Sequence, residues 1–144
     1  MDVKKILLPV DGSQSAEVAI EMVRKMAASF GAKIYVINVV ELRREGAIHE
    51  AYIYGGDVIK QFQTFSENII KDISQKLEGY DFEAVSVVGH PADEILNMAN
   101  EKDVDVIVMA THGMTAMKRF LVGSVTNYVV HHSKKPVLVI PVGK

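Results

Sequence analysis

The chain lacks cysteine and tryptophan, and only four prolines occur among its 144 residues. The absence of cysteine excludes disulfide frameworks, thiolate metal sites and cysteine nucleophiles. No segment approaches the roughly 20 apolar residues that a membrane-spanning helix needs. The apolar run that ends at Val10 is too short for the core of a signal peptide. We therefore expect a cytoplasmic protein with no membrane partner.

An excess of charge of either sign is also missing, because the formal net charge is only −2. Nucleic-acid binding usually leaves a basic footprint, so we expect no nucleic-acid partner. A hydrophobic fraction of 49% with 24% charged residues is ordinary for a globular protein. A chain of this length buries roughly two thirds of its unfolded surface in one core. The simplest organisation is a single domain over residues 1–144.

Several catalytic signatures are absent as well. No glycine is followed directly by lysine and then serine or threonine, and the dinucleotide glycine fingerprint is missing after the first apolar run. There is no Gly-x-Ser-x-Gly elbow. The adjacent His131 and His132 point to different faces of a predicted helix end, where they complement the helix dipole better than they bind a metal. The sequence therefore predicts neither catalytic nor metal-ligating side chains.

Short apolar runs alternate with segments of helical spacing along the whole chain. The predicted strands are residues 6–10, 33–40, 82–88, 104–109 and 136–141. Helical periodicity appears over residues 18–30, 57–77, from Pro91 onward and over 125–132. Residues 41–56 show no clean periodicity and are predicted to form a long loop. This alternation predicts an α/β fold with a parallel sheet, right-handed crossovers and helices on both faces.

The segment after the fourth predicted strand has the spacing of a phosphate-binding loop. Gly113 tolerates a sharp turn or a close approach to a ligand. Gly123-Ser124 precedes the last predicted helix, so Ser124 is a predicted N-cap. The free N–H groups of a helix N-terminus favour phosphate, and Lys118 and Arg119 could add cations. A glycine and a serine before a helix are equally compatible with plain capping that involves no ligand.

Asp11 follows the first predicted strand, where a carboxylate could hold a metal, a base or a ribose, or cap the next helix. Both interpretations stay open. In parallel α/β sheets, ligands bind beyond the carboxyl ends of the strands where the strand order reverses. If the first and fourth strands are neighbours, the Asp11 turn and the loop from Gly113 to Ser124 meet at this edge.

Three stretches together resemble the universal stress protein family: residues 8–13, residues 89–95, and residues 110–124 followed by 135–141. The last stretch resembles the ATP-binding subclass, whose pattern is glycine, two residues, glycine, nine residues, then glycine with serine or threonine. Ala110 occupies the place of the first glycine.

The resemblance implies a Rossmann-like, adenine nucleotide alpha hydrolase-like fold with a five-stranded parallel sheet of order 3-2-1-4-5. It also implies that Asp11 and Val39 contact adenine. The residues after the fourth strand would cradle phosphates bridged by Mg²⁺ or Mn²⁺. The implied nucleotide site consists of Pro9, Asp11, Val39, Met109, Ala110, Gly113, Gly123, Ser124 and Val125.

The implied function is that of a stress-response regulatory protein that binds ATP, or ADP or AMP, and forms a homodimer through residues 136–141. Binding rather than turnover is expected. Two alternatives remain open at this point: a slow ATPase or nucleotide hydrolase, and a stress module that no longer binds nucleotide.

Overall fold

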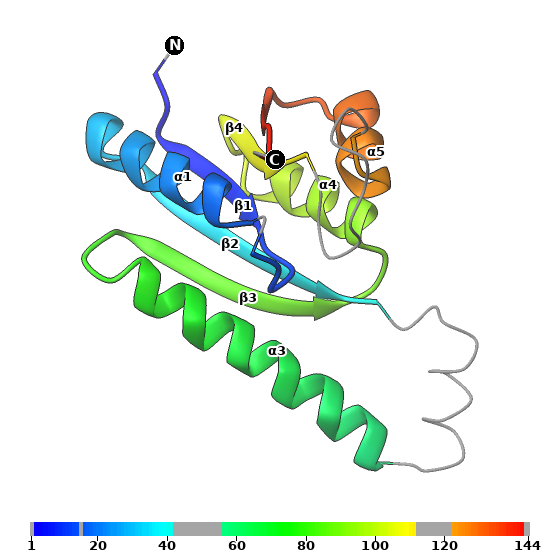
Figure 1. Cartoon of the computed structure of the whole chain (residues 1–144). Helices are drawn as coiled ribbons and strands as arrows, with labels where there is room; N and C mark the ends of the chain where they lie inside the picture. Colours follow the sequence, from blue (N-terminus) through cyan, green and yellow to red (C-terminus); the bar gives the residue numbers. More distant parts are fainter. Residues whose placement is uncertain (1, 15, 42–55, 112–121, 143–144) are drawn as a thin grey trace.

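Five parallel strands form the centre of the molecule (Figure 1), in a computed structural model that describes residues 2–14, 16–41, 56–111 and 122–142, without the side chains of 56–59. The strands are β1 (Lys5–Pro9), β2 (Lys33–Val40), β3 (Phe82–Val88), β4 (Val106–Ala110) and β5 (Val137–Ile140). The helices are α1 (Ala16–Phe30), α3 (Gly56–Lys76), α4 (Pro91–Glu101) and α5 (Ser124–His132). The strand order β3-β2-β1-β4-β5 confirms the predicted α/β topology.

Helices cover both faces of the sheet, as predicted. The alternation of side chains along a strand explains how one strand serves two cores. Ile6 and Leu8 of β1 pack in a cluster with α1 and α3, whereas Leu7 packs with α4 and α5 on the opposite face. All three side chains are fully buried. β1 is therefore the centre of the sheet, covered on both faces.

The amino end of the sheet is tied by one carboxylate. Oδ2 of Asp105 accepts the backbone N–H groups of Lys4 and Lys5 at 2.8 and 2.9 Å. The Asp105 N–H in turn donates to the Lys5 carbonyl at 2.9 Å. These bonds connect the start of β1 to the segment before β4. The fourth strand was predicted over residues 104–109. In the structure it is β4, which begins at Val106.

Lys76 connects the two helices that share one face of the sheet. Its ammonium group contacts Glu17 of α1 and, at 2.9 Å, Asp72 one turn earlier in α3. Hydrogen bonding to Glu17 first and Asp72 second raises the pKa of Lys76 above its ordinary value. A raised lysine pKa favours the folded state at neutral pH, and this contribution is lost only as the pH rises through the folded-state pKa.

Two further expectations from the sequence concern a long loop and membrane-spanning helices. The predicted loop over 41–56 falls mostly on residues 42–55, outside the described ranges, and α3 begins at Gly56. None of the helices in the described ranges is long and apolar enough to cross a membrane.

Candidate functional site

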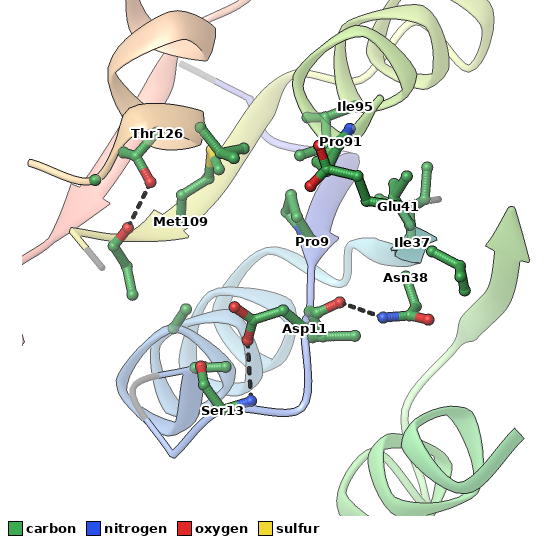
Figure 2. Close-up of a pocket in the computed structure, with 18 of the residues that line it drawn as sticks. Pro9, Asp11, Ser13, Ile37, Asn38, Glu41, Pro91, Ile95, Met109 and Thr126 are labelled. Carbon is green, nitrogen blue, oxygen red and sulfur yellow. Dashed lines mark hydrogen bonds between the residues drawn. The ribbon is translucent and has the colours of Figure 1, made fainter. Parts of the chain in front are cut away.

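A cavity of about 410 Å³ opens at the carboxyl edge of the sheet, where β1 and β4 lie side by side. Its walls come from the β1–α1 turn, the ends of β2 and β4, and the first turns of α4 and α5 (Figure 2). Parallel strands place all their carboxyl ends at one edge. The neighbouring positions of β1 and β4 therefore bring together segments about a hundred residues apart in sequence.

Most of the predicted site residues meet in this cavity. Those that line it are Pro9, Asp11, Val39, Met109, Ala110, Gly123 and Val125. Ser124 is exposed and is not among the lining residues. Gly113 lies in the segment 112–121, outside the described residues, together with Lys118 and Arg119. The structure thus brings together the predicted residues of four elements and leaves the middle of the predicted phosphate loop untested.

The turn after β1 is built around Asp11. Oδ1 of Asp11 accepts the backbone N–H of Ser13 at 2.9 Å, and this bond closes a tight Asx-type turn (Figure 2). α1 begins only at Ala16, whose N–H donates to the Ser13 carbonyl at 3.3 Å. The carboxylate therefore stabilises the turn and does not cap the helix. Half-buried Asp11 lines the cavity from this turn.

Gly12 is required for the shape of this turn. Its φ of +84° lies in the region that side chains disfavour, and a Cβ atom would stand 3.0 Å from Cδ1 and 3.1 Å from Cγ1 of buried Ile69. We expect Gly12→Ala to lower the free energy of unfolding by about 2 kcal/mol, through the left-handed backbone and the tight contact together. Urea unfolding monitored by circular dichroism measures the loss.

Gly31 provides the matched control for that substitution. Its φ is +66°, but a Cβ there would meet nothing within 4 Å. Gly31→Ala should therefore show the backbone cost alone, about 1 kcal/mol. Equal losses for the two variants would mean that contact with Ile69 contributes nothing to the turn.

The N-terminus of α5 faces the cavity, and its cap differs from the prediction. Gly123, not Ser124, is the N-cap, because the Asn127 N–H donates to the Gly123 carbonyl at 2.9 Å. The Gly123 N–H itself donates a hydrogen bond to the Thr111 carbonyl at 2.6 Å. No side chain in the described ranges caps this end. The first turn of α5 therefore presents the positive end of its dipole to the cavity, an arrangement that favours an anion.

Thr126 holds this helix end against the sheet. Its side chain is buried, and Oγ1 donates to the Ala110 carbonyl at 2.9 Å (Figure 2). Ala110, which occupies the place of the pattern's first glycine, is thus bonded to the first turn of α5. Thr126 was not predicted as a site residue, although a threonine in the first turn beside a candidate phosphate loop was a usable signal.

The opposite wall comes from α3 and was also missed. Phe62 and Phe65 line the cavity, and Phe65 is 49% exposed. Neither aromatic was predicted as a site residue, and both reach the cavity because the first half of α3 runs past the carboxyl edge of the sheet (Figure 1). Its apolar face therefore meets the cavity where no strand lies beneath it. Pro91 and Ile95 of α4 add further apolar surface.

The charge of the lining is acidic as far as the structure describes it. Asp11 and Glu41 are the ionisable side chains among the described lining residues. Glu41 follows the end of β2 and is half-buried. His131 and His132, by contrast, lie in the last turn of α5 with exposed side chains, where the sequence predicted that they complement the helix dipole. Among the described lining residues, therefore, no side chain supplies positive charge to a phosphate.

Comparison with known proteins relates the chain to one family. The model of the universal stress protein family matches residues 2–141. The chain is 32% identical over 152 residues to universal stress protein MJ0577 of Methanocaldococcus jannaschii, covering 95% of this chain and 94% of that protein. A solved structure of MJ0577 matches with a TM-score of 0.85 at 33% identity, covering 97% of this chain and 96% of that one.

Two further solved structures have the same fold. Universal stress protein UspA from Lactobacillus plantarum has a TM-score of 0.84 at 22% identity, with 97% of this chain and 99% of that chain covered. The universal stress protein from Archaeoglobus fulgidus, solved in complex with dAMP, has a TM-score of 0.63 at 25% identity, with 97% and 99% covered.

Proposed function

Because this chain belongs to the universal stress protein family, we propose that it binds an adenine nucleotide in the cavity and acts as a nucleotide-dependent regulatory protein of the stress response. One observation carries the proposal. The Asp11 turn, the end of β2, the end of β4 and the uncapped N-terminus of α5 converge on a single cavity of about 410 Å³. That volume falls in the range of small-molecule sites.

The two ends of the cavity suit the two ends of a nucleotide. In the proposal, Pro9, Val39 and Met109 supply the apolar surface against which a base and a ribose pack. The phosphates lie at the first turn of α5, beside Gly123 and Val125, where backbone N–H groups and the dipole favour negative charge. The dAMP complex of the Archaeoglobus fulgidus relative supports the choice of an adenylate.

A divalent cation would complement the acidic lining. The carboxylates of Asp11 and Glu41 offer oxygen donors that suit Mg²⁺ or Mn²⁺. No group of three or more ligating side chains gathers within the described ranges. In the proposal the metal is therefore held mainly by phosphate oxygens and water, as is usual for Mg²⁺. It would supply the positive charge that the described lining lacks.

The proposal also covers the organisation of the molecule. Residues 1–144 act as one domain, located in the cytoplasm and paired as a homodimer through residues 136–141. One observation supports the pairing: β5 is an edge strand of the sheet. Pro136 and Pro141 flank it and limit how far the edge pairing extends.

Nucleotide titrations test the proposed function. Thermal unfolding is followed with ATP, ADP, AMP and GTP, each with and without Mg²⁺. A ligand at 100 times its Kd stabilises the folded state by about 2.7 kcal/mol, so we expect a clear rise in Tm with adenylates and little with GTP. If no adenylate shifts Tm at millimolar concentration, the proposal fails.

Phosphate release in the same samples distinguishes binding from turnover. We expect no release above background. Steady release that vanished in Asp11→Ala while binding persisted would identify a nucleotide hydrolase instead.

A further inference from the structure

One amide side chain, that of Asn38, interrupts the apolar run of strand β2. Asn38 is 3% exposed and belongs to the wall of the cavity. Alternation places it on the same side of the sheet as Ile34 and Val36, which lie in the core beneath α1 and α3. Burying an amide without partners costs free energy, so the partners of Asn38 indicate what it does.

Both ends of the Asn38 amide are engaged. Nδ2 donates to the Val10 carbonyl at 2.9 Å, and Oδ1 accepts from the Ser86 hydroxyl on β3 at 3.2 Å (Figure 2 shows the first of these). The Val10 N–H donates to the Ile37 carbonyl at 2.9 Å. Val10 is therefore held on both sides by β2, although β1 ends one residue earlier at Pro9.

This anchor acts directly on the Asp11 turn. The Val10 carbonyl and the Asp11 N–H belong to one planar peptide unit. A hydrogen bond to that carbonyl consequently sets the direction in which Asp11 leaves the sheet. Asp11 then closes its turn with the Ser13 N–H. The chain of contacts runs from the edge strand through Asn38 to the carboxylate in the cavity.

We infer that Asn38 is a positioning residue: its amide fixes the Val10–Asp11 peptide and thereby the turn that forms one side of the ligand cavity. The turn itself follows from the contacts, and the effect on a nucleotide rests on the proposed function. An amide suits this role because it donates to a carbonyl and accepts from a hydroxyl at once. Leucine offers neither group, at nearly the same volume.

Hydrogen exchange in the ligand-free protein tests the inference without any nucleotide. The variants are Asn38→Leu and, should that one not fold, Asn38→Ala; Ser86→Ala is the control, because it leaves the bond to Val10 in place. We expect the Asn38 variants to speed exchange of the Ser13 amide by about tenfold, the factor for one hydrogen bond. The Lys102 amide, bonded to the Met98 carbonyl, serves as the remote reference.

The comparison with Lys102 separates local release of the turn from general destabilisation. Faster exchange at Ser13 alone supports the inference. Unchanged exchange at Ser13, or equal acceleration at Ser13 and Lys102, overturns it.

Affinity for AMP tests how the effect reaches the ligand. We expect Asn38→Leu to weaken binding by about tenfold and to add nothing to the loss caused by Asp11→Ala, because coupled residues are not additive. Additive losses would mean that Asn38 contacts the ligand by itself, and the positioning role would be wrong. If the wild-type protein binds no adenylate, the proposed function fails, while the exchange experiment still decides the role of Asn38.

Discussion

Gly123→Val is expected to weaken adenine-nucleotide binding by about 100-fold, which corresponds to about 2.8 kcal/mol. Gly123 lines the cavity at the N-cap of α5, where the backbone must come close to a phosphate in the proposed complex. A branched side chain there would obstruct access to the N–H groups of the first turn. Calorimetric titration with ATP and Mg²⁺ measures the change.

The backbone at Gly123 makes this a test of the site and not of folding. Its φ of −59° and ψ of 156° are accessible to valine, so the variant should keep its α5 helix, with a modest loss of Tm because valine is a poorer N-cap than glycine. Gly123→Ala adds one methyl group and should lose less affinity than the valine variant. Unchanged affinity in Gly123→Val would refute the assignment of the phosphates to this helix end.

Asp11→Ala is expected to cost about 30-fold in nucleotide affinity, or about 2 kcal/mol, the size of a hydrogen bond to a charged group. Two losses combine in this variant. The turn loses the bond between Oδ1 and the Ser13 N–H, and the cavity loses a carboxylate that the proposal offers to the divalent cation. The same calorimetric titration quantifies the effect.

Asp11→Asn is the matched control for Asp11→Ala. Its side-chain carbonyl can still accept the Ser13 N–H, so the turn remains while the charge disappears. We expect an affinity between those of the wild type and Asp11→Ala. Full affinity in Asp11→Ala would remove Asp11 from the site, and equal losses in both variants would assign the whole effect to its charge.

Much of the fold was predictable because its strands carry strong local signals. The β-branched runs that became β2 and β3 were predicted with the bounds that the structure has, residues 33–40 and 82–88. Alternation of strands and helices predicted a parallel sheet covered on both faces, but not the order of its strands. The order 3-2-1-4-5 came from the family resemblance, because periodicity describes the faces of an element and not its neighbours.

The site was predictable where it depends on strand ends and less so where it depends on packing. The Asp11 turn follows from strands that end at one edge, whereas Pro9 and Met109 came from the family resemblance, and the structure places all three residues in the cavity. Phe65 was not predicted as a site residue, because helical spacing identifies an apolar face without saying how far the sheet extends beneath it. Asn38 was overlooked even though a lone amide in an apolar strand was a visible signal.

The N-cap of α5 shows a different limit of sequence reasoning. Serine is preferred at N-caps because its side chain accepts a backbone N–H. Here the cap is Gly123, and Ser124 becomes the first helical residue with an exposed side chain. A statistical preference for one residue type could not distinguish two adjacent positions. The difference matters because a cap without a side chain leaves the helix end open toward the cavity.

An amide-resolved NMR titration of the wild-type protein with AMP tests the central claim most directly, namely that the cavity at the carboxyl edge is an adenine-nucleotide site. We predict saturable chemical-shift changes of the amides of Asp11, Val39, Gly123 and Val125. The amide of Asp103, which precedes β4 at the opposite, amino end of the strands, should not shift. The absence of shifts at millimolar AMP, or shifts that lie away from the cavity, would contradict the claim.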